Sequence, residues 1–128
     1  MIIDLETALH IHEKSIAEYG GSRGLRDEGA LLAALARPFA TFNQQDLYPT
    51  HIEKAASIFE SIIINHPFMD GNKRTAYVFL RATLFFYGFD VMAFEDEKYK
   101  MTIDASSGTI RFDEIKQWIE DRLIKINP

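Results

Sequence analysis

The residues best suited to chemistry lie together in residues 65–74, which read Asn-His-Pro-Phe-Met-Asp-Gly-Asn-Lys-Arg. Histidine side chains titrate near neutrality, so His66 is suited to take a proton from an attacking hydroxyl group. Asp70 is suited to hold Mg²⁺, because magnesium at phosphate sites is typically bound by one or two carboxylates together with phosphate oxygens. Lys73 and Arg74 add positive charge beside them. The stretch therefore indicates chemistry on a phosphate-containing substrate.

Two segments with helical periodicity flank this stretch and would position it. Residues 50–64 place apolar side chains at the spacing of an amphipathic helix, and Thr50 with Glu53 fits a capping box at its start. Residues 75–87 are apolar almost all the way round, which predicts a central helix buried on most of its faces. Between the two, the ring of Pro67 disfavours the right-handed helical conformation for His66 and favours an extended or turn geometry.

The start of the second helix carries charges of the wrong sign for a helix start. The first turn of a helix presents unpaired N–H groups and a partial positive charge, so each cation there costs roughly 0.3–1 kcal/mol. Lys73 and Arg74 are explained if phosphate binds at this turn, with Gly71 allowing a close approach of the backbone and Asn72 supplying an amide. Asp70 would be the N-cap of the helix, a Mg²⁺ ligand, or both.

Each feature of the stretch also has a structural explanation when taken alone. A His-Pro turn, an aspartate N-cap and a surface Lys-Arg pair all occur in proteins without a functional role. Their combination between two apolar helices favours a functional site. For Phe68 a structural role is favoured over a functional one, and we expect its side chain to point inward as a hydrophobic anchor of the loop.

Residues 66–74, His-Pro-Phe-Met-Asp-Gly-Asn-Lys-Arg, resemble the signature of the Fic/Doc superfamily, whose Fic branch usually reads His-Pro-Phe-x-Asp/Glu-Gly-Asn-Gly-Arg. Lys73 replaces the glycine of the Fic branch, and Lys-Arg-Thr-Ala after the asparagine is what the Doc (death-on-curing) toxins carry. Fic proteins commonly place another arginine three residues after the first, and here that position is Tyr77. The resemblance is therefore closer to the Doc branch.

The resemblance implies a function. A Doc-type toxin of a bacterial toxin–antitoxin pair would transfer the γ-phosphate of ATP to a threonine of elongation factor Tu and halt translation. His66 would then be the general base toward the target hydroxyl, and Asp70 would position Mg²⁺. The residues holding the phosphates would be Gly71, Asn72, Lys73 and Arg74, with Arg74 also among the catalytic residues.

Two alternatives to this function stay open. If the nucleotide lay in the Fic orientation, the same His66 would direct attack at the α-phosphate and transfer AMP. Lys73 argues against that, because a bulky cation in place of glycine should narrow the pocket and add positive charge that favours binding of the distal phosphates. The other alternative is a domain that binds a nucleotide or a phosphorylated partner without turning it over. A pure binder, however, needs neither a base such as His66 nor a metal ligand such as Asp70.

The sequence also indicates how the activity would be restrained. Many Fic proteins carry a Ser/Thr-x-x-x-Glu-Gly/Asn inhibitory helix, and the sequence contains no such stretch. We therefore expect restraint by a separate antitoxin protein (Phd-like), a segment of which would fold into a surface groove on binding.

Residues 20–27, Gly-Gly-Ser-Arg-Gly-Leu-Arg-Asp, form the second stretch of interest. Its glycines and charges predict a surface loop or short hairpin that leads to Asp27, the N-cap of a helix through Ala36. The stretch is similar to the flap of Doc toxins, which borders the active site and contacts the target. This similarity implies roles for Gly21, Arg23 and Arg26, although a structural ion pair explains Arg26 equally well.

The remaining pattern predicts an all-α fold, a compact Fic/Doc-like helical bundle in a single domain spanning residues 1–128. Further helices are expected over residues 5–19, 95–106 and about 113–124, with Asp4 capping the first, and residues 89–94 would cross the surface. Gly88 is expected just after the end of the central helix.

Several side chains outside the motif are expected to be structural. Phe42 and Tyr48 should be packing residues, and His51 should be exposed. His10 and His12 lie two positions apart, so they point to different faces of the first helix and make a poor metal pair. We expect both to be surface or core-edge histidines.

Composition excludes several classes of protein. The sequence has no cysteine, which excludes disulfide frameworks and thiolate metal sites, and its first residues lack the pattern of a signal peptide. The net charge of −5 argues against general binding to nucleic acid or membranes. We therefore expect a cytoplasmic protein.

Overall fold

The structure is a computed structural model and describes residues 1–126 of the chain. In chain order its elements are α1 (Leu5–Tyr19), α2 (Glu28–Ala36), the short 3-10 helix η1 (Arg37–Phe39), β1 (Thr41–Phe42), β2 (Gln45–Asp46), α3 (His51–Asn65), α4 (Asn72–Phe86), β3 (Phe89–Val91), α5 (Glu95–Ser106), α6 (Phe112–Arg122) and β4 (Leu123–Lys125). The predicted all-α class is confirmed, since the strands are short additions to a helical bundle.

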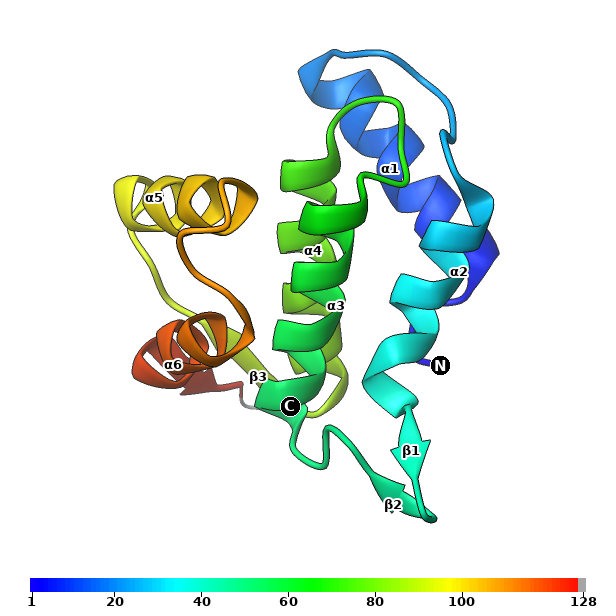
Figure 1. Cartoon of the computed structure of the whole chain (residues 1–128). Helices are drawn as coiled ribbons and strands as arrows, with labels where there is room; N and C mark the ends of the chain where they lie inside the picture. Colours follow the sequence, from blue (N-terminus) through cyan, green and yellow to red (C-terminus); the bar gives the residue numbers. More distant parts are fainter. Residues whose placement is uncertain (127–128) are drawn as a thin grey trace.

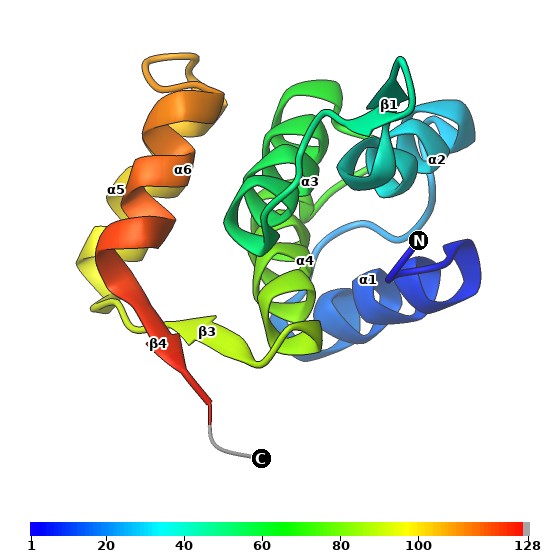
Figure 2. The ribbon, with the colours of Figure 1, turned by 90° about the horizontal axis from the view of Figure 1, so that it is seen from below.

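The helices form three groups. α3 and α4 run side by side through the centre of the molecule, α1 and α2 lie on one side of them, and α5 and α6 lie on the other, as Figures 1 and 2 show from two directions. The loop from α3 to α4 comes out at the end of the bundle where α1 finishes, so the predicted site lies beside the loop that follows α1 (Figure 1).

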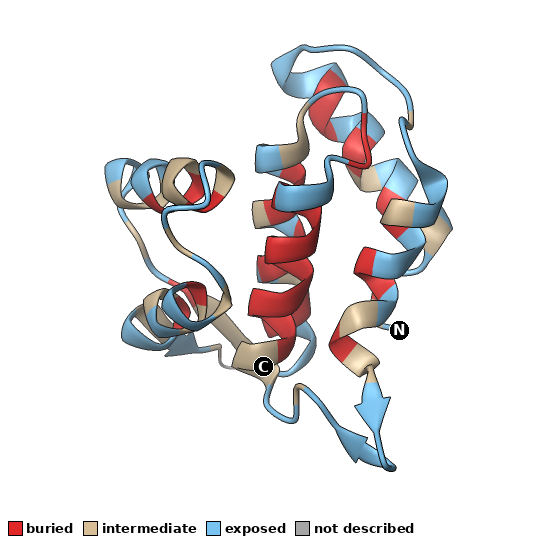
Figure 3. Ribbon diagram, in the orientation of Figure 1, coloured by how far each residue is buried: buried red, intermediate tan, exposed pale blue. Residues whose placement is uncertain are grey.

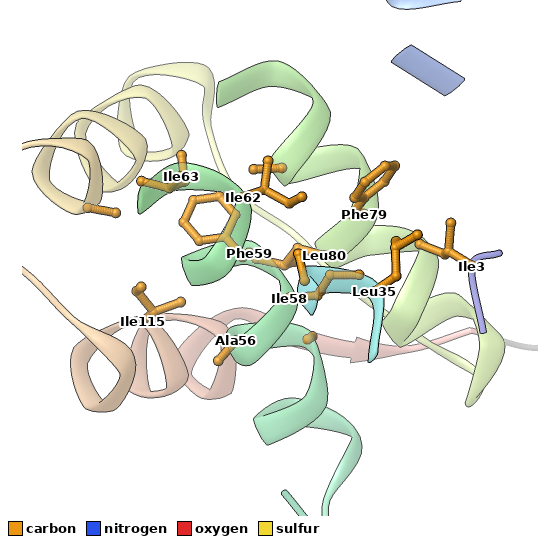
Figure 4. Close-up of a cluster of buried hydrophobic side chains, with 14 of the residues drawn as sticks. Ile3, Leu35, Ala56, Ile58, Phe59, Ile62, Ile63, Phe79, Leu80 and Ile115 are labelled. Carbon is orange, nitrogen blue, oxygen red and sulfur yellow. The ribbon is translucent and has the colours of Figure 1, made fainter. Parts of the chain in front are cut away.

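The most buried helix is α3, in which every residue from Lys54 to Ile63 is buried (Figure 3). Its Phe59, Ile62 and Ile63 lie in one hydrophobic cluster with residues from the other helices, as Figure 4 shows. Residues 75–87 form most of the expected central helix, α4, and its side facing α3 is buried. Its burial is less complete than expected, because Phe85 and Phe86 at its end are 66% and 65% exposed. Apolar composition does not reveal which faces other elements cover.

The buried face of α3 also holds charge. Glu60 is 5% exposed, and its carboxylate forms ion pairs with Arg37 at 2.9 Å and with Arg111 at 3.2 Å. Buried charges are tolerated when they are paired in this way. Glu60 therefore links α3 to η1 and to the segment that precedes α6.

The helix ends that local sequence signals predicted are confirmed. Asp4 and Asp27 cap α1 and α2 by accepting hydrogen bonds from backbone N–H groups in the first turn. Thr50 and Glu53 form the expected capping box at the start of α3. Gly88, with φ +89°, follows α4 as predicted.

The strands were not predicted. β1 pairs antiparallel with β2 in a hairpin at the end of the molecule opposite the α3–α4 loop (Figure 1). β3 pairs antiparallel with β4, so the expected last helix ends at Arg122 instead of near residue 124. Segments of two or three residues carry too little periodicity to be recognised, and their pairing depends on distant parts of the chain.

Two side-chain expectations were also wrong. Phe42 is 69% exposed at the hairpin and does not pack, whereas Tyr48 accepts a hydrogen bond from Arg37 and packs as expected. His51 is half-buried instead of exposed, and its ring stacks on Phe89 with centroids 4.2 Å apart. Burial lowers the pKa of His51 below its ordinary value, because desolvation disfavours the charged ring. Within residues 1–126 no helix is both long and apolar enough to cross a membrane.

Candidate active site

His66 lies where α3 ends and the loop begins. Its backbone is left-handed (φ +47°, ψ +59°), which agrees with the expected avoidance of the right-handed conformation before a proline but is a turn conformation and not an extended one. This conformation is uncommon for residues other than glycine, although histidine is among those that adopt it more often. The guanidinium group of Arg26 donates hydrogen bonds to the carbonyl oxygens of Asn65 and His66, the latter at 2.6 Å. Arg26 thus holds this turn of the backbone, and the imidazole of His66 stays exposed at the site.

The segment after His66 pairs with the glycine loop of residues 20–27. The N–H groups of Arg26 and Asp27 donate to the carbonyl oxygen of Pro67 at 2.7 and 3.0 Å, and Met69 N–H donates to Gly24 at 3.0 Å. The predicted flap is therefore a loop, and it pairs with the motif instead of folding into a hairpin with itself.

Phe68 anchors this pairing from inside. Its side chain is 1% exposed, which confirms the expected inward orientation. One face of the ring stacks on the imidazole of His12 in α1, with centroids 3.9 Å apart and planes within 5° of each other. The loop is therefore fastened to the core and to α1 at the same residue.

Asp70 is not the N-cap of α4. Gly71 holds that position in a left-handed conformation (φ +73°), and no side chain caps the helix. The carboxylate of Asp70 instead accepts hydrogen bonds from Ser22 N–H at 3.0 Å and Gly71 N–H at 2.8 Å. Asp70 lies one residue before the N-cap position, and the tight turn there directs its carboxylate away from the first-turn N–H groups that an N-cap side chain would bind.

These contacts favour the charged form of Asp70. The hydrogen bond from Ser22 and then the one from Gly71 lower its pKa below the ordinary value, and the nearby charge of Arg74 acts in the same direction. Each carboxylate oxygen receives one hydrogen bond and keeps a lone pair. Such a carboxylate fits one position of a Mg²⁺ ion whose other ligands are phosphate oxygens and water. No group of three or more metal-binding His, Cys, Asp or Glu side chains exists in the described part of the chain.

Asn72 begins α4, and its side chain is turned back onto the loop. Its Oδ1 accepts from Phe68 N–H and its Nδ2 donates to the Phe68 carbonyl oxygen, both at 3.0 Å. This pair of bonds closes the loop across four residues. Nδ2 retains a second hydrogen, so phosphate binding by the Asn72 amide stays a prediction.

Lys73 and Arg74 lie in the first turn of α4, as expected, and both are exposed. The guanidinium of Arg74 lies over the ring of Tyr19, 4.5 Å from its centroid. The first N–H groups of a helix have no partner within the helix, so the turn offers backbone donors and two cations together.

These groups share one open cleft of about 440 Å³, whose lining includes Tyr19, Gly20, Gly21, His66 and Met69 to Arg74. The structure therefore brings together the residues predicted for proton transfer, metal binding and phosphate binding. A cleft of this size takes a polar group of the dimensions of a polyphosphate.

The three predicted flap residues have different positions. Gly21 lies against the cleft, and a Cβ atom there would be 2.8 Å from Asp70 Oδ2, so only glycine allows this close approach. Arg26 binds the backbone carbonyls described above and makes no ion pair within the described residues, so its role is structural but differs from the one expected. Arg23 is 70% exposed and forms a surface ion pair with Glu13 at 3.6 Å.

Sequence reasoning missed three residues that contact the motif from α1 and the flap. These are His12, Tyr19 and Ser22. His12 was expected at the surface or the core edge, whereas it is 4% exposed, and the periodicity of α1 gave no sign that its ring would reach the motif.

The fold and the site thus define a small helical protein in which a histidine, a carboxylate and two cations meet between the end of α3 and the start of α4. The family model described as "Fic/DOC family" matches residues 2–84. The chain is 49% identical over 59 residues to "Toxin Doc" of Mycolicibacterium smegmatis, a match that covers 46% of this chain and 45% of that protein. It is 30% identical over 109 residues to "Protein kinase doc" of Escherichia phage P1, which covers 84% of each.

The chain belongs to the Fic/Doc family. Both curated relatives carry the name Doc, which supports the Doc branch that Lys73 indicates. The matched part of the chain covers less than half the length of the Mycolicibacterium relative.

Proposed function

We propose that this protein is a Doc-type toxin that transfers the γ-phosphate of ATP to a hydroxyl group of a protein target. A threonine of elongation factor Tu is the candidate acceptor, and inhibition of translation would be the result. The proposal is supported by family membership and by the relative from phage P1 whose name describes a protein kinase.

One observation carries the proposal: His66, Asp70, Lys73 and Arg74 line a single cleft at the first turn of α4. In phosphoryl transfer the protein contributes mainly positioning and charge stabilisation, which such a cleft can supply. Lys73 and Arg74, with the free N–H groups of the turn, would bind the phosphates and balance the charge that develops on them.

In the proposed reaction the acceptor oxygen attacks the γ-phosphorus, and the bond from that phosphorus to the oxygen bridging it to the β-phosphate breaks. His66 takes the proton of the hydroxyl at its exposed imidazole, and ADP leaves with the bridging oxygen. When bound at Asp70, Mg²⁺ would neutralise phosphate charge. The flap, paired with the motif through Pro67 and Met69, would border the entry of the target.

The binding partner that restrains the toxin would be an antitoxin segment in a larger cleft of about 880 Å³ between α1, α4 and α5. Its wall includes the exposed apolar side chain of Val78 and the cations Lys14, Lys73 and Arg74. An amphipathic segment with acidic side chains fits this lining. Because Lys73 and Arg74 line both clefts, such a segment would reach the phosphate site.

The antitoxin proposal is tested with Val78→Glu, which places a carboxylate on the apolar part of the cleft. We expect the affinity for the antitoxin to fall at least tenfold, about 1.4 kcal/mol, in a calorimetric titration. Leu32→Glu is the matched control, because Leu32 of α2 is 39% exposed, close to the 37% of Val78. Equal affinities of the two variants would contradict this position for the antitoxin.

Phosphate transfer is tested with ATP labelled on the γ-phosphate and, separately, on the α-phosphate, using purified elongation factor Tu as acceptor. Transfer of γ-label that is lost in His66→Ala and kept in His10→Ala supports the proposal. His10 is exposed on α1 and serves as the matched histidine. Transfer of α-label would show an AMP-transferase instead. Absence of both labels would mean that elongation factor Tu is not the acceptor or that the protein binds phosphate without transferring it. Labelling of other proteins in a cell extract separates these, and calorimetry with ATP and Mg²⁺ shows whether the protein binds ATP at all.

A further inference from the structure

The contacts of Asp70 include a side chain to which neither the motif nor the comparisons give a role. We propose that His12 is a positioning residue of the active site. Its imidazole fixes the peptide group between Asp70 and Gly71, and through that peptide it sets the direction of the Asp70 carboxylate and of the first N–H groups of α4. This inference rests on the proposed function, because it names what holds that site in place.

His12 is held in one orientation before any ligand binds. It is 4% exposed on the face of α1 that packs toward the motif. The parallel stack with Phe68, at 3.9 Å between centroids, fixes the plane of the imidazole. Because Phe68 is itself in the core, the stack ties the imidazole plane to the rigid part of the fold.

The edge of the ring meets the backbone of the motif. His12 Nε2 lies 2.7 Å from the carbonyl oxygen of Asp70. A carbonyl oxygen can only accept, so Nε2 carries a hydrogen and donates it. The first helical bond of α4 runs from Thr75 N–H to Gly71, one residue further on. The Asp70 carbonyl thus precedes the helical ladder, and His12 supplies a donor to it.

Fixing this carbonyl has two consequences at the site. It sets the plane of the following peptide, whose Gly71 N–H donates to Asp70 Oδ1 at 2.8 Å and so orients the carboxylate. It also sets the direction in which α4 starts, and therefore where its free N–H groups point. The packing is close, since a Cβ atom on Gly71 would be 3.1 Å from Ile16 Cδ1 and 3.7 Å from His12 Nε2.

Two substitutions of His12 separate the effect of its hydrogen-bond donor from the effect of its aromatic ring. His12→Phe keeps an aromatic ring for the stack on Phe68 and removes the donor. His12→Gln removes the ring and places an amide N–H close to the position of Nε2. We measure the affinity for ATP with Mg²⁺ by calorimetry, kcat and KM of phosphate transfer, and the exchange rate of the Gly71 amide hydrogen by NMR. Leu9→Phe is the matched control, because Leu9 is an exposed residue of the same helix and lines neither cleft.

We expect His12→Phe to weaken ATP binding and to lower kcat/KM by about 10–100-fold, the range found when groups that orient catalytic or metal-binding residues are removed. Exchange of the Gly71 amide should become faster, whereas His12→Gln should stay within a few-fold of the wild type in all three measurements. If His12→Phe does not fold, His12→Asn replaces it, because the shorter amide does not reach the Asp70 carbonyl.

Two results would overturn the inference: His12→Phe that behaves as the wild type, or His12→Gln that loses as much as His12→Phe, which would assign the effect to packing of the ring. A wild-type protein that neither binds ATP nor transfers phosphate would refute the proposed function instead. In that case only the exchange rates test the positioning role of His12. An exchange rate of the Gly71 amide hydrogen in His12→Phe equal to that of the wild type would refute this role.

Discussion

Replacement of Phe68 by alanine tests whether the loop of the active site is held from the core. The Phe68 side chain is 1% exposed, so the substitution removes a fully buried ring and its stack on His12. Truncation of buried phenylalanine costs about 3–5 kcal/mol through lost burial and the cavity left behind. Domains typically have about 5–15 kcal/mol of stability, so most of the protein should still fold.

The free energy of unfolding is measured by urea denaturation followed by circular dichroism. Phe42→Ala is the matched control, because Phe42 is 69% exposed at the β1–β2 hairpin and should change the unfolding free energy by less than about 0.5 kcal/mol. In the folded fraction, phosphate transfer should fall together with ATP affinity, since Phe68 does not line the cleft and acts on it through His12 and the loop. A loss below 1 kcal/mol, or equal losses in the two variants, would refute the view that Phe68 anchors the site.

Three further perturbations act on separate parts of the molecule. Gly21→Ala places a Cβ atom 2.8 Å from Asp70 Oδ2, so the carboxylate must move and affinity for ATP with Mg²⁺ should fall about tenfold by calorimetry. Gly20→Ala serves as the control at a similar positive φ, because a Cβ atom added at Gly20 would meet no atom within 4 Å. Equal ATP affinities of the two variants would contradict the close contact between residue 21 and Asp70. The pKa of His51 is lowered by burial, so the unfolded chain binds a proton first as pH falls, and stability should decline below about pH 6.5. Urea unfolding at several pH values should show a smaller decline for His51→Phe, and an unchanged pH dependence would speak against this cause. Lys73→Ala should raise the unfolding free energy by about 0.3–1 kcal/mol while weakening ATP binding, because the cation is unfavourable at a helix start unless an anion is present. A loss of stability in urea would show that Lys73 has a structural partner instead.

The sequence predicted the parts of the fold that local chemistry determines. Asp4, Asp27 and Thr50 each cap a helix with a neighbour three residues away, and a contact that short is visible in the sequence. The motif was predictable for the same reason. Residues 66–74 are consecutive, so a tight loop alone brings His66 and Arg74 to one cleft.

The contacts that hold the motif were not predictable, because they join distant residues. His12 and Asp70 are 58 positions apart, and Ser22 and Asp70 are 48 apart. The sequence indicated a surface or core-edge position for His12 and gave no sign of what its ring meets. The β3–β4 pair was missed for a similar reason, since three-residue strands more than thirty positions apart leave no local pattern.

The first turn of α4 explains why these distant contacts matter. Its N-cap is a glycine without a side-chain cap, and its first residues include two cations, so local sequence favours this helix start only weakly. The start is instead fixed from α1 by His12 and from the flap by Ser22. Because the large cleft also borders α1 and α4, a partner bound there lies against the elements that set the geometry of Asp70. Such a partner would also contact Lys73 and Arg74 of this first turn, since both residues line the two clefts.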